Sequence, residues 1–333
     1  MPSNGVQYDH TVSKPSESAT ILDVARRAGV SRTTVSRVLN EPDRVSPDTL
    51  KRVQDAAEAL NYAPNSFARG LRSGRTGVIA LLVGDISQPF HGSLAQAVAA
   101  AAEERGLGVM LYDLGHSTAR LESVLRKLPR QGVDGLIIAT ADDISTAAVA
   151  DAVADARAQG LAVVTGVEQF GVEGIAFVRT EHAEAPRLAL EKLAAAGAQR
   201  PALLLGDKHG PIGRQLVLGA GEATVIEAGY SFSRAADAVH ALGPEHDALV
   251  VTTIPMALGA MSALAAIGRQ LPIIVCEEVP LAAHVTPAFS TAAVPPEETG
   301  REMVRLMAAL LDGTQVEPRV LRPVYTGRES FPS

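Results

Sequence analysis

Residues 31–40 carry side chains whose types and spacing suit the recognition of base pairs. The polar members of this stretch are Arg32, Thr33, Ser36 and Arg37, which fall on one face of a predicted helix. They offer hydrogen-bond donors and positive charge without bulk, and such a face fits the major groove of DNA. Apolar residues, among them Val35, repeat on the opposite face. The chemistry that this stretch predicts is therefore direct contact with nucleic acid.

Local signals predict how this helix is held. Thr20 can cap a first helix, and Asp23 three positions later completes a variant of the capping box. Gly29 ends that helix, because glycine tolerates the left-handed conformation that a sharp turn needs. Ser31 caps the second helix. The sequence therefore predicts a helix-turn-helix over residues 20–40, with a solvated surface hairpin as the alternative.

A third helix is predicted over residues 42–60, with Ser46 as its cap and Pro47 at its first position. The segment that follows, residues 63–75, has Phe67, Ala68 and Leu71 at helical spacing. Its two glycines make it a poor helix in isolation. This pattern favours a compact helical unit joined by a weakly structured segment to the apolar strand that follows.

Residues 20–75 resemble the DNA-binding headpiece and hinge of the lactose-repressor (LacI/GalR) family of bacterial transcriptional regulators. The matching segments are DVARRAGVS, TVSRVLN, VSPDT and LNYAPN, followed by Ala68, Arg69 and Leu71. The resemblance implies that Arg32, Thr33 and Arg37 occupy the base-reading positions. The DNA it implies is a double-stranded palindromic operator.

Other contacts with DNA also follow from the resemblance. The implied phosphate contacts, which set the register on the duplex, are Thr20, Ser31, Thr34 and Asn40. The implied hinge contacts are Asn65, Arg69 and Leu71. The hinge would fold when two copies meet on DNA, and Leu71 would then wedge into the minor groove and kink the duplex. The alternative for Leu71 is a linker residue packed on the rest of the protein.

Charge is divided unevenly along the chain. The formal net charge is −7 over 333 residues. Residues 1–76 hold 11 Lys and Arg against 8 Asp and Glu, a net +3, whereas residues 77–333 hold 19 against 29, a net −10. This division fits a basic DNA-reading unit on an acidic body. A hydrophobic content of 47 % is enough for that body to bury a sizeable core.

The cysteine content and the lengths of the apolar runs indicate the cellular compartment. Cys276 is the single cysteine, which excludes an intrachain disulfide and a cysteine cluster for a metal. Residues 1–18 are polar and lack the apolar core of a signal peptide. No apolar run approaches the ~20 residues that cross a bilayer. We therefore expect a cytoplasmic bacterial protein, associated with the nucleoid, with a disordered N-terminal tail and no membrane partner.

From Gly77 onward, apolar strands alternate with helices in two series. The first has strands at 77–85, 109–114, 135–140 and 161–167, and the second has strands from Ile175 and at 201–207, 247–253 and 271–279. A helix ending near Gly229 follows the strand at 201–207. Two such series predict two doubly wound α/β lobes with parallel sheets and a cleft between them. The resemblance, carried here by ISQPF, VDGLII, MALGA, EEVPLA and GRES, implies a type-I periplasmic-binding-protein fold in which the chain crosses between the lobes three times.

These patterns divide the chain into four regions. We predict a tail over residues 1–18, an all-α helix-turn-helix domain over 19–62, a hinge over 63–76 and an effector-binding and dimerisation domain over 77–333. Within the last region, the first lobe is predicted to take residues 77–174 and 293–315. The second lobe is predicted to take 175–292 and 316–331.

The cleft is where the resemblance implies a small effector. The candidate contacts are Asp85, Gln88, Phe90, His91, Arg214, Thr253 and Glu277. His91 has an alternative role as a helix cap. Arg214 follows the glycine-containing loop DKHGPIG, but its spacing to the next helix departs from the family.

The chain departs from the family's usual pocket at several other positions. His91 stands where a second aromatic is usual, and Gly166 and Val167 replace an Asp–Arg pair. Thr253 and Ile254 replace Asn–Asp, and Glu277 and Glu278 replace Asp–Asp. Because sugar binding in this family uses bidentate polar groups, an ordinary hexose is less expected here. A different small molecule, an apolar or acidic compound, a protein partner and no effector all remain open.

Catalysis is not predicted. Carboxylates such as Asp85, Asp142 and Glu277 come without a histidine cluster, a phosphate loop or a nucleophile elbow, and neither a cofactor nor a metal ion is expected. The sequence predicts a DNA-binding regulator, a repressor acting as a homodimer, whose DNA affinity is modulated by a small molecule in the cleft. A solute-binding receptor is the alternative, and it explains only the lobes. No heptad repeat follows the last strand, so a dimer is preferred to a coiled-coil tetramer.

Overall fold

The structure is a computed structural model of the chain, and it describes residues 19–40, 44–60, 62, 75–142, 144–166, 172 and 174–331. The predicted hinge contacts Asn65, Arg69 and Leu71 lie outside these ranges, as does the side chain of Asn40. The chain divides into two compact units between Thr76 and Gly77, at the start of the predicted effector-binding domain. Within the described ranges, no helix is long and apolar enough to span a membrane.

Three helices form the first unit, the headpiece: α1 (Ile21–Ala28), α2 (Arg32–Asn40) and α3 (Pro47–Ala59). The predicted capping box is present, because the Asp23 carboxylate accepts the Thr20 backbone N–H at 3.0 Å while the Thr20 hydroxyl accepts the Asp23 N–H. Gly29 ends α1 in the left-handed region with φ 63°. Ser46 caps α3 as predicted. The local signals thus place each helix end as expected.

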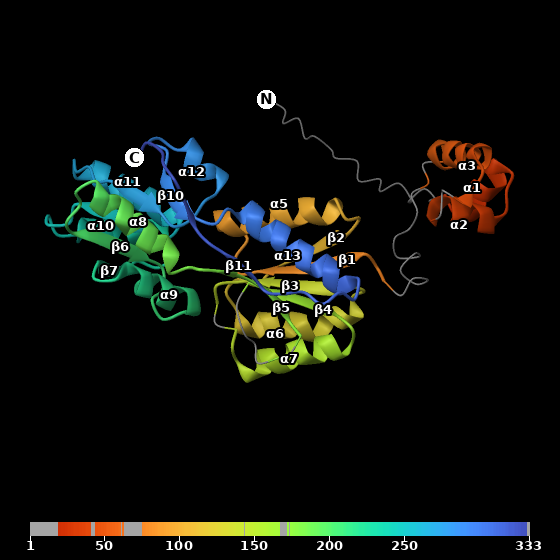
Figure 1. Cartoon of the computed structure of the whole chain (residues 1–333), viewed down its shortest axis with the longest axis horizontal. Coiled ribbons are helices and arrows are strands. Elements are labelled where there is room, and N and C mark those ends of the chain that lie inside the picture. The colour runs from red at the N-terminus through yellow and green to blue at the C-terminus, as the bar shows by residue number, and fades with distance from the viewer. Residues whose placement is uncertain are drawn as a thin grey trace, which may run out of the picture. The chain divides into compact units, whose positions relative to one another are not determined.

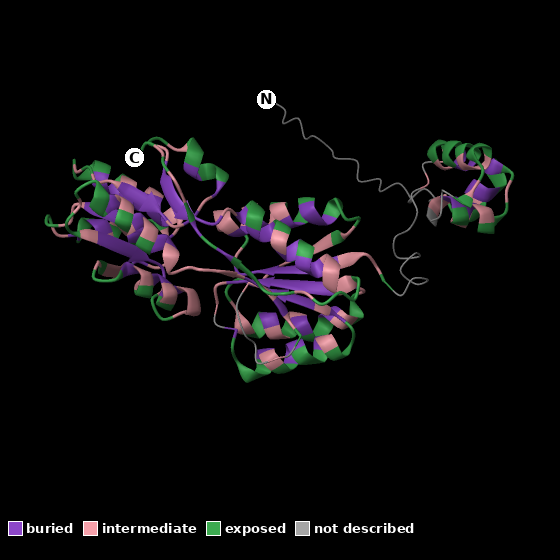
Figure 2. Cartoon of the chain, viewed as in Figure 1, coloured by how far each residue is buried: buried purple, intermediate pink, exposed green. Residues whose placement is uncertain are grey.

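The headpiece has its own small core (Figure 2). Its buried residues are Val24, Ala25, Ala28, Val35, Val38, Val53 and Ala56. Arg52 on α3 contacts the end of α1, because its guanidinium donates to the Ala28 carbonyl oxygen at 2.8 Å. The same guanidinium lies 3.5 Å from the Asp48 carboxylate. Arg52 therefore caps the C-terminal end of α1 and has a structural role.

The first sheet of the body runs in the order β11-β5-β4-β3-β1-β2, with every pairing parallel. Its strands are β1 (Val78–Val83), β2 (Gly108–Asp113), β3 (Gly135–Ala139), β4 (Ala162–Thr165), β5 (Ala176–Thr180) and β11 (Arg319–Leu321). Helices α5 (Pro89–Glu103) and α13 (Pro296–Leu311) cover one face, and α6 (Thr118–Lys127) and α7 (Ala147–Ala158) cover the other (Figure 1). A short 3-10 helix, η2 (Leu128–Arg130), follows α6.

The second sheet runs in the order β12-β10-β9-β8-β6-β7, and only β12 is antiparallel to its neighbour among the described strands. Its strands are β6 (Pro201–Leu205), β7 (Thr224–Glu227), β8 (Ala248–Val251), β9 (Ile273–Val275), β10 (Ser290–Ala293) and β12 (Val324–Thr326). Its helices are α8 (Glu184–Ala195), α9 (Pro211–Ala220), α10 (Phe232–His240), α11 (Ile254–Ala266) and α12 (Pro280–His284). The two doubly wound lobes of the predicted fold class are therefore present.

The boundary between the lobes was predicted too early in the chain. The strand from Ile175, assigned to the second lobe, is β5, and it pairs with β4 of the first sheet. Likewise β11, within the stretch 316–331 assigned to the second lobe, pairs in parallel with β5. The apolar pattern identifies a strand but not its neighbours, because pairing depends on contacts between distant parts of the chain. The first lobe therefore extends to Thr180, and it also includes the later segment from α13 to the end of β11 at Leu321.

Sequence reasoning also missed elements in the second lobe. The helix predicted to end near Gly229 ends at Ala220, and β7 and α10 follow it. β7 is a four-residue edge strand without a fully buried residue, so it lacks the apolar run that marked the other strands. The return of α13 to the first lobe was predicted correctly, since Met303, Val304 and Met307 are buried in that lobe's core.

We expect Arg328→Ala to destabilise the body by about 2–3 kcal/mol, because it leaves a largely buried carboxylate without its partner. The Arg328 guanidinium donates to the two carboxylate oxygens of Glu278 at 3.0 and 2.8 Å, and both side chains are less than one-fifth exposed (19 % and 17 %). Urea denaturation would measure the loss. Arg126→Ala, which breaks a more exposed pair with Glu122 on α6, is the control and should cost under about 1 kcal/mol. Equal losses would contradict the structural role of Arg328.

Candidate functional site

The exposed face of α2 presents the predicted base-reading residues. Arg32, Thr33 and Arg37 are exposed, whereas Val35 and Val38 on the opposite face are at most 4 % exposed. Neither arginine forms an ion pair with a described residue. Packing of the valines against α1 and α3 therefore fixes the helix, and the two guanidinium groups are left available to a partner.

The first turn of α2 is ordered by its own side chains. The Ser31 hydroxyl accepts the Thr34 backbone N–H at 3.1 Å, and the Ser31 and Thr34 hydroxyls lie 2.8 Å apart. At the start of α1, the Thr20 hydroxyl donates to the Asp23 carboxylate at 2.6 Å. Two of the predicted phosphate contacts, Thr20 and Ser31, thus already serve as helix caps, and the Thr34 hydroxyl is bonded to the Ser31 cap. A hydroxyl can keep a capping bond and still bind a phosphate oxygen, because it offers both a donor and two lone pairs.

A cavity of about 180 Å³ lies in the body, far above the ~10–15 Å³ that admits one water molecule. Residues of all three connections between the lobes line it. Thr180 and His182 come from the connection after β5, Ala293 and Val294 from the one after β10, and Pro323 from the one between β11 and β12. An occupant would therefore touch the segments about which the lobes can move.

Phe90, one of the predicted contacts, links the cavity to both lobes. Its side chain lines the cavity and packs against the hydrophobic cores of the first and the second lobe. An aromatic ring also reaches the cavity from the second lobe, because Tyr230 follows β7 and lies against Gly206, where a side chain would collide with the ring. Phe90 and Tyr230 thus bring one aromatic ring from each lobe to the cavity wall.

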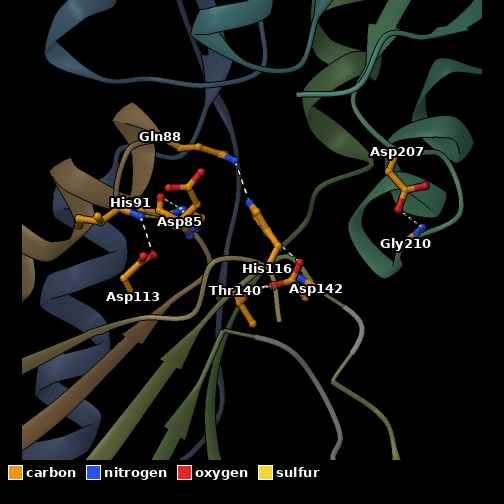
Figure 3. A network of polar contacts seen from close by, with 10 residues as sticks. Asp85, Gln88, His91, Asp113, His116, Thr140, Asp142, Asp207 and Gly210 are labelled. Atoms are coloured by element: carbon orange, nitrogen blue, oxygen red, sulfur yellow. Dashed lines mark hydrogen bonds and ion pairs between the residues drawn. The ribbon is translucent and has the colours of Figure 1, made fainter. Parts of the chain in front are cut away.

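Figure 3 shows a polar network at the ends of three neighbouring strands of the first sheet. His116 lies between Gln88, whose Nε2 is 3.0 Å from His116 Nε2, and Asp142, whose Oδ1 is 2.9 Å from His116 Nδ1. The Thr140 hydroxyl donates to the other Asp142 oxygen at 2.6 Å. One tautomer of His116 satisfies both hydrogen bonds: its Nδ1–H donates to Asp142, and its Nε2 accepts from the Gln88 amide. The network holds Gln88 at the cavity.

His91 is buried in the protein, whereas Asp85 is only partly buried and its carboxylate bonds within its own turn. The Asp85 carboxylate accepts the Ser87 N–H at 2.8 Å, and hydrogen bonds from the Ser87 side chain and backbone lower the pKa of Asp85. His91 is buried and its Nδ1 lies 2.8 Å from the Asp85 carbonyl oxygen, so that nitrogen carries the proton. Burial lowers the pKa of His91, which is therefore neutral. His91 lines the cavity as a fixed polar wall, whereas Asp85 shapes the turn that precedes α5.

Burial shifts the pKa of two ionisable groups that line the cavity. Burial raises the pKa of Glu277 to about 7, although its carboxylate accepts the Ile254 N–H at 2.7 Å. Burial lowers the pKa of His182 to about 4. Beside Glu277, the Thr253 hydroxyl oxygen is buried without a hydrogen-bond partner among the described residues. The cavity wall thus combines weakly charged polar groups with apolar ones.

Five of the seven predicted effector contacts line the cavity: Gln88, Phe90, His91, Thr253 and Glu277. Asp85 does not line it, and neither does Arg214, whose guanidinium donates to the His209 carbonyl oxygen within its own loop. Sequence reasoning missed Tyr230 and His182. Tyr230 follows a strand that was not recognised, and His182 lies two residues past the end of β5, a position that marks it as a cleft residue only once β5 is placed.

Comparisons with known proteins agree on one family. Residues 20–65 match the lacI family of bacterial regulatory proteins, and residues 171–331 match the periplasmic binding protein-like domain. The chain is 31 % identical to the HTH-type transcriptional regulator CelR of Thermobifida fusca over 90 % of this chain and 94 % of that protein.

Two solved structures are similar along nearly the whole chain. A CelR–cellobiose complex has a TM-score of 0.66 at 28 % identity, over 94 % of this chain and 99 % of that one. A Lac repressor bound to ONPG in the repressed state has a TM-score of 0.77 at 25 % identity, over 94 % of this chain and 99 % of that one. The helix-turn-helix unit and the two-lobed body are therefore shared with these proteins.

We expect Glu277→Gln to change how stability depends on pH. The folded protein keeps the Glu277 proton up to about pH 7, whereas the unfolded chain releases it near 4.5. The stabilisation from Glu277 is therefore complete below pH 4.5 and falls as the pH rises through that window, by about 3 kcal/mol at about 1.4 kcal/mol per pKa unit. Relative to the wild type, the variant should gain stability across the window.

Urea denaturation of both proteins at a series of pH values measures this difference. Glu222→Gln, at an exposed position, controls for the loss of one carboxylate. A constant difference in stability between Glu277→Gln and the wild type, at every pH, would contradict a buried, protonated carboxyl.

Proposed function

Because the chain belongs to the lacI family of bacterial regulatory proteins and is thus a DNA-binding transcriptional regulator, we propose that it represses transcription as a homodimer on a palindromic operator. Its DNA affinity is modulated by a small molecule in the cavity of the body. The alternative, a solute-binding receptor, leaves the headpiece without a role. The relatives are transcriptional regulators and not enzymes.

The observation that carries this proposal is the exposed face of α2. Two arginines and a threonine stand on a helix that is packed from behind by Val35 and Val38. An arginine can bind guanine O6 and N7 together, and each such pair supplies ~1–3 kcal/mol of discrimination between bases. We assign base reading to Arg32, Thr33 and Arg37.

The remaining DNA contacts position the headpiece. Thr20, Ser31, Thr34 and Asn40 hold phosphates at the helix ends and set the register without reading sequence. In a homodimer, two copies of α2 enter successive major grooves about 34 Å apart. Asn65, Arg69 and Leu71 form the hinge, and Leu71 opens a base step in the minor groove between the half-sites.

Cavity occupancy is coupled to DNA binding through the connections between the lobes. A ligand that contacts Thr180, Val294 and Pro323 favours one angle between the lobes over another. A change of that angle in both subunits alters the spacing of the hinges across the dimer. Such coupling requires that the ligand bind one of the two states more tightly. The CelR complex holds cellobiose and the Lac repressor structure holds ONPG, which supports a small molecule in this cavity.

Selection of bound fragments from random duplex DNA by the full-length protein at moderate salt tests the proposal. Enrichment of a palindrome with a flexible pyrimidine–purine step at its centre supports both the regulator function and the hinge. Absence of any enriched motif, together with binding that is lost uniformly as salt rises, would refute sequence-specific recognition by α2.

We expect Arg37→Ala to relax base preference at one position of each half-site. The loss of a bidentate contact should reduce discrimination there by ~1–3 kcal/mol while leaving binding to random DNA nearly unchanged. Fluorescence anisotropy with the selected operator and its single-base variants measures this. Lys51→Ala, which removes one exposed positive charge from α3, is the matched control and should leave base preference unchanged. Equal losses on operator and random DNA for Arg37→Ala would contradict its role.

A further inference from the structure

We propose that the effector of this protein is an uncharged molecule with an apolar face, and that the cavity rejects anions such as sugar phosphates and carboxylates. This inference rests on the proposed function, because it concerns the ligand of the same cavity. It narrows the alternatives that the sequence left open, among them an acidic compound.

No positive side chain is available to an anion. Among the described residues, the cavity lining contains neither Lys nor Arg. The body residues outside the described ranges, namely 143, 167–171, 173 and 332–333, contain none either. Every positive side chain of the body is therefore accounted for, and none lies in the cavity wall.

Several cations near the cavity residues already bind other groups, among them Arg322, directly before Pro323, which pairs with Glu184 at 3.3 Å. Arg179, next to Thr180, donates to the Glu181 carboxylate at 2.6 Å. Arg328 donates to both oxygens of Glu278, the neighbour of Glu277. Arg214 donates to the His209 carbonyl oxygen. Moving any of these groups into the cavity would break the hydrogen bonds that it donates now.

Helix N-termini often bind anions, and at one of those that reach the cavity a backbone donor is already occupied. α5 and α11 begin at the cavity, and each has a proline in its first turn, which removes one backbone donor. At α11, the Ile254 N–H is already bound by the Glu277 carboxylate. An anion at this position would displace or face Glu277, and it would lose its hydration without gaining a counter-charge.

The polar groups that do line the cavity suit an uncharged partner. The His91 and His182 imidazoles are neutral at neutral pH, because burial lowers the pKa of each. Gln88 is held by His116 and can bond without a charge. The rest of the lining is largely apolar and includes Phe90, Leu94, Val178, Ile212 and Met303. A ligand that carries both hydroxyl groups and hydrocarbon surface matches this mixture of polar and apolar groups.

Thermal unfolding of DNA-free, full-length protein with matched ligand sets tests the inference. Each set keeps the sugar ring and changes one substituent to a charged one: phenyl β-glucoside with phenyl β-glucuronide, ribose with ribose 5-phosphate, and glucose with glucose 6-phosphate and glucosamine. We expect stabilisation by at least one uncharged member, and at least ~10-fold weaker binding by its charged partners, or about 1.4 kcal/mol. Stronger stabilisation by any charged member, or none by any uncharged member, would overturn the inference.

A charge introduced into the lining provides a second, independent test. Gln88→Lys should raise the affinity for the anionic partner of the bound ligand ~10-fold, because it supplies the missing counter-charge. Gln159→Lys adds the same charge at an exposed position at the end of α7 and is the control. Equal effects of the two variants would show that general electrostatics, and not the cavity, determines preference.

These measurements do not depend on DNA binding. If the selection experiment yields no operator while the uncharged ligand binds, the regulator mechanism fails and the ligand inference stands. If an operator is found and a charged ligand stabilises the protein, the ligand inference fails and the regulator function stands.

Discussion

The body depends on three chain crossings between two separate sheets. Each sheet packs against its own hydrophobic cores. In the described part of the body, the chain passes from one sheet to the other after β5, after β10 and between β11 and β12. Because the cavity is lined by residues of all three connections, filling it alters the contacts of the only described segments that join the lobes covalently. The proposed effector site thus coincides with the connections about which the lobes would move.

Two neighbouring carboxyl groups, those of Glu277 and Glu278, have different partners and different roles. Glu278 accepts hydrogen bonds from Arg328 and from the Thr291 hydroxyl, and it ties the end of β9 to the last segment of the chain. Glu277 points to the α11 N-terminus and the cavity, where burial favours its protonated form. A difference of one position along the chain therefore separates a structural ion pair from a polar group of the cavity wall. Both carboxyls are largely buried, so the Arg328 guanidinium beside Glu278, and not residue type, makes that distinction.

Capping bonds contribute more to the stability of the headpiece, relative to its core, than they do in the body. The headpiece core is small, so helix ends and single capping bonds contribute a large share of its order. The same hydroxyls that cap α1 and α2 are those assigned to phosphates, and the same packing that buries Val35 and Val38 turns Arg32 and Arg37 outward. The capping bonds and the packing that fold this unit thus also position the residues that we propose to contact DNA.

The sequence alone determined the helices of the headpiece and the α/β class of the body, because caps, glycine turns and apolar periods are local signals. Thr20, Gly29 and Ser46 act where they were expected. Tertiary structure alone decided which sheet takes β5 and β11, that Arg214 turns away from the cavity, and that Tyr230 and His182 reach it. Strand pairing and cavity lining depend on contacts between residues distant in the chain, and no local pattern encodes them.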